Sequence, residues 1–331
     1  MIWQMRSIAS KEVPMAEIEK KNNLTIQWFP GHMTKAQRMI KENLKLVDVV
    51  IELLDARIPV SSSNPMIGSL IENKPKVIVL NKADLAEEEH TKAWIACFRR
   101  QGIPVVAIDS MTGKGIKQLI TQVEKLAAAK INHLKAKGIK VRAVRAMILG
   151  IPNVGKSSLI NRLQGSAVVK TADKPGVTRG KQWIKISKTL ELLDTPGVLW
   201  PKFEDPEKGF HLAVSGAIND EVYDGELLME LFVDYLRTEY PDRLAARYKL
   251  TLPLPETGYE VLEAIARKRG CLRAGGKIDD EKVRRLLLTE FRSGKLGGFT
   301  LDKCKSAVEE KAEEKTEEAV SAECAMTEET K

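Results

Sequence analysis

Apolar runs long enough for buried strands alternate with helical periodicity through the first two thirds of the chain. We predict strands at 49–54, 76–80, 104–108, 143–149, 182–186 and 190–193, and helices at 87–101, 115–130 and 156–163. Continuous apolar runs are typical of strands that are buried on both faces, and strands that alternate with helices pair in parallel. The pattern therefore predicts an α/β domain with a mostly parallel sheet covered by helices on both faces.

Helices are also predicted before the first strand and after the last one. An amphipathic helix is expected at 33–47, with a basic stripe formed by Lys35, Arg38, Lys41 and Lys45. After residue 205, helical periodicity without strands covers 207–236, 259–268 and 279–293. We predict a disordered extension at 1–24, the α/β domain at 25–204, a small all-helical domain at 205–304 and an acidic, disordered tail at 305–331.

Composition excludes several classes of protein. The chain has no apolar run of the length that spans a membrane, and its first residues lack the apolar stretch of a signal peptide. We therefore expect a cytoplasmic protein, a monomer, with no membrane partner. The four cysteines have no CxxC spacing, which argues against a zinc site or a disulfide framework.

The chain is basic, with a formal net charge of +8. The segment 305–331 holds nine Glu against four Lys, so the part before it is more basic still. Such a surplus suggests a polyanionic partner, and the alternative is a solvated basic surface without one.

A phosphate-binding loop is predicted at 150–157, which reads GIPNVGKS and matches GxxxxGK[ST] between a predicted strand and a predicted helix. Backbone N–H groups at the helix start would face the phosphates, Lys156 would reach the β and γ oxygens, and Ser157 would bind Mg2+. The expected contact set is Asn153, Val154, Gly155, Lys156, Ser157 and Ser158. The alternative is an ordinary glycine-rich turn.

Two later segments fit the magnesium side of the same site. Asp194 follows the strand predicted at 190–193, where a second carboxylate beside Mg2+ is expected, and the amide of Gly197 would sense the γ-phosphate. Thr178, in the sequence PGVTR at 175–179, would close over Mg2+ and the γ-phosphate, although a Pro-Gly pair can simply mark a turn.

Guanine is the base that residues 81–84 (NKAD) predict. The Asp84 carboxylate can accept hydrogen bonds from N1–H and from the 2-amino group of guanine, whereas adenine lacks that donor pair. Asn81 and Lys82 complete the motif, and Ser110, in the sequence SMTGK, would add backbone contacts to the base. Because the base-reading motif precedes the phosphate loop, the reverse of the order in Ras-like GTPases, we expect a circularly permuted domain.

The residue that orients the attacking water is not evident, because Val198 follows Gly197 where Ras-like enzymes carry glutamine. His32 could position a water through its imidazole, or it could have a capping or core role. Asn153 could bind a monovalent cation beside the phosphates.

These motifs, in this order, resemble the circularly permuted GTPases of the ribosome biogenesis GTPase A family. The resemblance covers 26–302 and includes residues 28–33 (WFPGHM) and 55–59 (DARIP). It implies hydrolysis of GTP to GDP and phosphate, with Mg2+ and with K+ held by Asn153. It also implies His32 as the catalytic group and stimulation by the immature large (50S) ribosomal subunit. With Lys156 and Thr178 from the motifs above, His32 completes the predicted set of catalytic residues. The helical region resembles an RNA-binding module, so rRNA and ribosomal proteins are the implied partners.

Basic side chains in the helical region fit contacts with RNA phosphates, although each one can equally be a solvated surface residue. The candidates are Arg267, Lys268, Arg269, Arg273, Lys277, Lys282, Arg284, Arg285, Arg292 and Lys295. Two other functions stay open: a GTP-gated RNA-binding scaffold in which hydrolysis is incidental, and an ATP-dependent kinase or ATPase, which conflicts with Asp84. A mitochondrial member of the same family also stays open.

Overall fold

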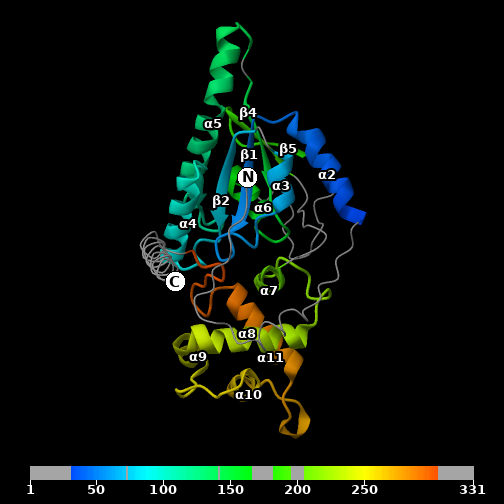
Figure 1. Cartoon of the computed structure of the whole chain (residues 1–331), viewed down its shortest axis with the longest axis vertical. Coiled ribbons are helices and arrows are strands. Elements are labelled where there is room, and N and C mark those ends of the chain that lie inside the picture. Colours follow the sequence, from blue (N-terminus) through cyan, green and yellow to red (C-terminus); the bar gives the residue numbers. More distant parts are fainter. Residues whose placement is uncertain (1–30, 72–73, 141, 166–181, 195–204, 305–331) are drawn as a thin grey trace, which may run out of the picture.

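The computed structural model describes residues 31–71, 74–140, 142–165, 182–194 and 205–304. A six-stranded sheet flanked by helices forms one part of the molecule, and a group of helices lies beyond one edge of that sheet (Figure 1). The predicted extension at 1–24 and the predicted tail at 305–331 lie outside the described residues. No helix in the described ranges has the length and apolar character needed to cross a bilayer.

All six predicted strands are present. They are β1 (Val49–Asp55), β2 (Lys76–Asn81), β3 (Val105–Ala107), β4 (Val144–Leu149), β5 (Gln182–Lys185) and β6 (Leu190–Asp194), in the order β3-β2-β1-β4-β6-β5. Only β5 is antiparallel to its neighbour. Every residue of β1 is buried, as its continuous apolar run predicts, so the mostly parallel sheet is confirmed.

Helices cover both faces of the sheet. They are α2 (Gly31–Leu44), α3 (Pro65–Leu70), α4 (Glu88–Arg100), α5 (Ile116–Ala136) and α6 (Lys156–Gln164). The buried side chains of α5 and α6 pack with Ile51 and Ile148, whereas those of α2, α3 and α4 pack with Val50 and Leu54 on the other face. The prediction missed the short helix α3, and it ended α5 too early, because α5 continues beyond its last buried residue, Ala127.

The region after residue 205 is helical, as predicted, but more finely divided. It contains α7 (Pro206–Ser215), α8 (Gly225–Glu239), α9 (Pro241–Tyr248), α10 (Gly258–Arg269), the 3-10 turn η1 (Ala274–Gly276) and α11 (Asp280–Arg292). The helical periodicity predicted over 207–236 covers two helices, because Gly216 ends α7 in a left-handed conformation (φ 80°). Asp224 then caps α8, where its side chain accepts hydrogen bonds from the amides of Glu226 and Leu227.

The last described segment, 299–304, runs back from α11 to the sheet region. Leu301 donates its N–H to the Arg57 carbonyl (2.8 Å), and the Trp94 indole donates to the Asp302 carbonyl (2.7 Å). The Asp302 carboxylate accepts from the Ser61 hydroxyl (2.8 Å) and lies 2.7 Å from Nδ1 of the buried His211 in α7. The predicted helical domain is therefore joined to the α/β domain at both of its ends.

Candidate nucleotide site

Three loops that are distant in the sequence meet at the carboxyl edge of the sheet. They follow β2, β3 and β4, which run parallel and therefore end at the same edge. The buried Asn81 joins all three: its Nδ2 donates to the Val154 carbonyl (2.8 Å), and its Oδ1 accepts from the Ser110 hydroxyl (2.7 Å). A Cβ at position 155 would lie 2.3 Å from Asn81 Nδ2, so only glycine fits there.

Lys82 connects the predicted base loop to the predicted phosphate loop. Its ammonium donates to the Asn153 carbonyl (2.8 Å) and to Asp55 Oδ2 (2.9 Å), from a backbone with φ +58°. Burial lowers the pKa of Lys82, while the Asp55 carboxylate favours the charged form. A lysine held by a carboxylate and a carbonyl has a fixed position, so its stem can form one wall of a flat binding site.

The predicted guanine reader, Asp84, is exposed at the start of the turn after Lys82. Partial desolvation raises the pKa of Asp84, and the nearby carboxylate of Asp109 adds to that rise. Hydrogen bonds from N–H donors would stabilise the charged form of the Asp84 carboxylate. The exposed position and the adjoining fixed loops suit a ligand that supplies these donors.

The second predicted base loop, at 109–114, is held in shape by a residue that the sequence analysis missed. Asp109, two residues after the end of β3, accepts from the Met111 amide (2.7 Å) and from the Thr112 hydroxyl (2.5 Å), which curls the chain over 109–114. Arg162 in α6 secures the same loop, because its Nε donates to the Ser110 carbonyl (3.1 Å). An Asp followed by Ser at the next position and by Thr three positions on is a local signal for such a turn.

The predicted phosphate loop wraps around the ammonium group of its own lysine. Lys156 is buried, and its Nζ donates to the Ile151 carbonyl (2.5 Å) and to the Gly150 carbonyl (3.1 Å). Asn153 (φ +54°) and Gly155 (φ +99°) take left-handed conformations that turn the loop into the start of α6. Helix N–H groups, a lysine and a tight glycine-containing curl are the donor set that a polyphosphate needs, so these residues fit the group.

Ser157 and Ser158 occupy the first turn of α6 and are half-buried. Asp194 ends β6, which is the parallel neighbour of β4, so its backbone lies at the edge that carries the phosphate loop. His32 lies within the first turn of α2 rather than ahead of that helix. The structure describes no side chain for His32 or Asp194, and Thr178, Gly197 and Val198 lie outside the described residues.

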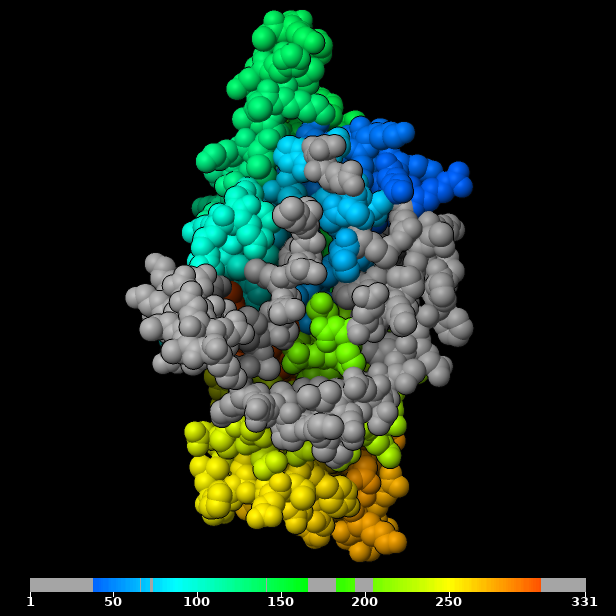
Figure 2. All heavy atoms as spheres, viewed as in Figure 1, coloured from blue at the N-terminus to red at the C-terminus, as the bar shows by residue number. Residues whose placement is uncertain are grey.

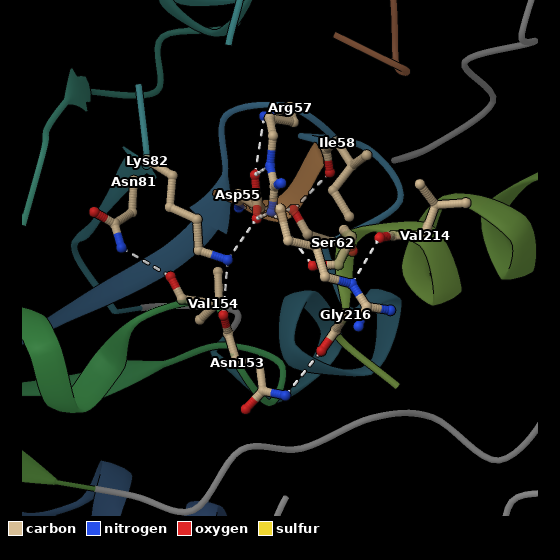
Figure 3. A network of polar contacts seen from close by, with 12 residues as sticks. Asp55, Arg57, Ile58, Ser62, Asn81, Lys82, Asn153, Val154, Val214 and Gly216 are labelled. Atoms are coloured by element: carbon tan, nitrogen blue, oxygen red, sulfur yellow. Dashed lines mark hydrogen bonds and ion pairs between the residues drawn. The ribbon is translucent and has the colours of Figure 1, made fainter. Parts of the chain in front are cut away.

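A ring of polar contacts extends this site to the helical region (Figure 3). Asp55 binds Lys82 on one side and Arg57 on the other, where Arg57 Nη2 lies 2.7 Å from Oδ2. Arg57 also donates to the Ser215 carbonyl (3.4 Å), and Asn153 Nδ2 donates to the carbonyl of the next residue, Gly216 (2.8 Å). The ring thus closes at the carboxyl end of α7.

Asp55 is ionised within this ring, although it is buried. Burial disfavours the ionised form of Asp55, but Arg57 and Lys82 hold its pKa well below the ordinary value. Residues 55–57 entered the sequence analysis only as part of a resemblance, because nothing local shows that this carboxylate meets a lysine 27 residues away.

Comparison with known proteins agrees with this geometry. Residues 145–229 match the family model described as 50S ribosome-binding GTPase. The chain is 50% identical over 283 residues to ribosome biogenesis GTPase A of Bacillus pumilus, which covers 86% of this chain and 100% of that protein. The chain belongs to the ribosome biogenesis GTPase A family. The family member of Thermotoga maritima is 32% identical over 278 residues, covering 84% of this chain and 94% of that protein.

Solved structures of the family show the same architecture. GDP-bound YlqF from T. maritima superposes with a TM-score of 0.58 at 28% identity, over 82% of this chain and 99% of that one. The GNP-bound form gives the same TM-score, 0.58, at 29% identity. The resemblance, the permuted P-loop fold and the GTPase activity expected from the sequence are thereby confirmed, and the ATP-dependent alternative is set aside. A GTPase domain of this kind uses a guanine nucleotide with Mg2+.

Proposed function

We propose that this member of the ribosome biogenesis GTPase A family is a cytoplasmic assembly factor in late maturation of the large (50S) ribosomal subunit. The immature particle, through its rRNA and ribosomal proteins, stimulates GTP hydrolysis, and hydrolysis drives release of the protein. The observation that carries the proposal is the 50% identity over the full length of a ribosome biogenesis GTPase. The contact ring supports a switch, because it joins the nucleotide loops to α7.

The nucleotide is held by the three loops at the carboxyl edge of the sheet. Asp84 accepts from the guanine edge, the stem of Lys82 lies along the base, and Asn81 and Ser110 keep the two base loops in register. The amides of 153–158 face the phosphates, and Lys156 turns from its loop carbonyls to the β and γ oxygens. Ser157, Thr178 and Asp194 hold Mg2+, and the Gly197 amide senses the γ-phosphate.

Catalysis needs a substitute for the glutamine that Val198 replaces, because valine cannot bind a water. We assign the orientation of the attacking water to His32 and the binding of K+ to the amide oxygen of Asn153. The amide nitrogen of Asn153 already donates to Gly216 at the end of α7 (2.8 Å). Cation binding and the position of α7 therefore depend on the same side chain.

The helical region supplies RNA contacts with fewer residues than the sequence suggested. Arg292 was a wrong candidate: its guanidinium donates to the carbonyls of Val214 and Ala213 (3.0 and 2.9 Å) and pairs with Asp220, so it caps α7. Four exposed candidates form neither an ion pair nor a side-chain hydrogen bond within the described chain and are the better ones: Lys268, Lys277, Arg285 and Lys295.

The proposal is tested by measuring GTP turnover with and without immature large subunits, with mature subunits as the control. Co-sedimentation with the immature particle in GTP, GDP and a non-hydrolysable analogue is measured in parallel. We expect stimulated turnover and retention only in the triphosphate states. If turnover stays at its basal rate while retention still depends on the nucleotide, the protein is a GTP-gated scaffold instead.

A further inference from the structure

The carboxyl end of α5 forms a protrusion, defined here as residues 128–140, that the nucleotide site does not use. The buried residues of α5 are Leu119, Val123 and Ala127, yet the helix continues to Ala136. These further nine residues extend it by about 13 Å at 1.5 Å per residue. Figures 1 and 2 show this end of the helix standing out from the body at the opposite end of the molecule from α10 and α11.

The protrusion is strongly basic. The sequence has no Asp or Glu from Lys125 to Gly165. Lys135, Lys137 and Lys140 are exposed, and none of them forms an ion pair within the described chain. Lys185 and Lys188, both exposed, lie in and after β5 beside the amino end of β6, at the same edge of the sheet as the base of the protrusion.

The base of the protrusion is anchored, so its lysines have a defined place. The buried Asp48 carboxylate accepts from Lys130 (2.6 Å) and from Arg142 (2.8 Å), which ties the helix and the strand that follows it together. At the tip, Gly138 is left-handed (φ +69°) and Ile139 donates its N–H to the Leu134 carbonyl (3.1 Å), which closes the turn. Three unpaired lysines are thus presented on a fixed support.

We propose that the protrusion at 128–140 is a second RNA-docking surface, in which Lys135, Lys137 and Lys140 contact backbone phosphates of an RNA duplex. The proposal rests on the proposed function, which supplies RNA as the polyanion. Lysine ammonium groups bind phosphates as point charges without reading bases, so this surface adds affinity and orientation but no sequence preference. Basic ends at both extremes of the long axis then let one protein bridge two RNA segments.

Other partners fit this surface less well. An interfacial helix presents a broad apolar face with aromatic residues to lipid, whereas the exposed large apolar side chain of this protrusion is Ile139, at 50% exposure. A protein partner needs a buried aromatic or aliphatic anchor in a pocket, and the described residues of the protrusion include no aromatic ring other than His133. A surface with several positive charges and little exposed apolar area is typical of phosphate binding.

The test compares the full chain carrying Lys135→Gln, Lys137→Gln and Lys140→Gln with a matched variant carrying Lys92→Gln, Arg99→Gln and Lys117→Gln. Both remove three exposed positive charges, but the second set lies on α4 and the amino end of α5. Binding to a duplex RNA hairpin is measured over a range of salt concentrations. We expect the protrusion variant to bind about ten- to hundredfold more weakly at low salt, with a log–log salt slope smaller by about two to three.

Equal behaviour of the two variants would overturn the proposal. So would loss of binding to anionic phosphatidylglycerol vesicles with unchanged RNA binding, which would make the protrusion a membrane contact. Failure of the proposed function would give another result, because GTP turnover of the unmodified protein would then not be stimulated by immature subunits. Basal GTP turnover and thermal unfolding of both variants should match the unmodified protein, because all six side chains are exposed and none is among the proposed nucleotide contacts.

Discussion

The two edges of the sheet carry the same kinds of charged residue in opposite settings. At the carboxyl edge, Asp55 pairs with Arg57 and Lys82, and the side chains of Asp55 and Arg57 are 3% and 2% exposed. At the amino edge, Asp48 also binds two cations, but the side chains of Lys130 and Arg142 are 51% and 42% exposed. In the first set the carboxylate and Arg57 are both buried, whereas in the second set only the carboxylate is buried and its two cations stay in contact with water.

The energetic consequence of this difference is large. Removing one partner of a buried pair leaves an uncompensated buried charge and costs about 3–5 kcal/mol. Asp48 has two exposed cations, so the loss of one of them leaves the carboxylate still paired with the other and costs less. The carboxyl edge should therefore respond strongly to single substitutions, and the amino edge should respond only when several charges are removed together.

The largest effect is expected from Lys156→Ala at the carboxyl edge. The variant lacks the ammonium group and therefore its charge-assisted hydrogen bonds to two phosphate oxygens. Each of these bonds is worth about 1.5–3 kcal/mol, so affinity for GTP should fall at least about a hundredfold. Calorimetric titration with Mg2+ measures this. The matched change at the amino edge, Lys135→Ala, should leave GTP affinity unchanged, and an equal loss in both variants would contradict the assignment of the site.

Next in size is the cost of breaking the ring. Asp55→Asn leaves Arg57 buried beside a neutral amide, so the free energy of unfolding should fall by about 3–5 kcal/mol. Asp48→Asn should cost clearly less, because Lys130 and Arg142 can return to water. Urea denaturation of both variants measures the two changes in the free energy of unfolding. Equal costs would remove the contrast between the two edges, and the double variant Asp55→Asn with Arg57→Gln should recover part of the loss.

The same pair predicts a dependence of stability on pH. The pKa of Asp55 is held below its ordinary value, so its contribution is complete above the unfolded-state pKa of about 3.9 and is lost as pH falls below it. The free energy of unfolding should therefore drop more steeply on acidification in the unmodified protein than in the double variant. Parallel slopes between about pH 5 and about pH 3 would show that the ring makes no ionic contribution.

A smaller effect is expected from His32→Ala. Loss of a general catalyst should lower particle-stimulated hydrolysis by about a hundredfold, with little change in GTP affinity. His90→Ala is a suitable control, because His90 also lies in the first turn of a helix, α4. A parallel loss of binding and turnover would mean that His32 has a structural role instead.

The smallest effect concerns the monovalent cation. Exchange of K+ for Na+ should slow turnover if Asn153 holds the ion, and Asn153→Ala should abolish the difference between the two salts. Turnover at matched ionic strength is the measurement, because screening alone would change both edges of the sheet. The same rate in both salts would leave Asn153 only its contact with Gly216.

The amino-acid sequence alone determined the strands, the phosphate and base motifs, and their permuted order. These are local properties: a continuous apolar run predicts a buried strand, and GIPNVGKS between a strand and a helix predicts a phosphate loop from its own residues. The break between α7 and α8 was missed although Gly216 and Asp224 are local signals, because apolar periodicity continued across them.

Only the tertiary structure decided which charges became fixed and which stayed available. Asp55 meets Lys82, Arg292 caps α7, and Asp302 reaches Ser61 across 241 residues of chain, while Lys135, Lys137 and Lys140 remain in water. Burial and long-range contact are set by packing of the whole chain, and no spacing rule within one segment contains them. A lysine in the sequence is therefore a positive charge, and the fold determines whether it positions a loop or binds a partner.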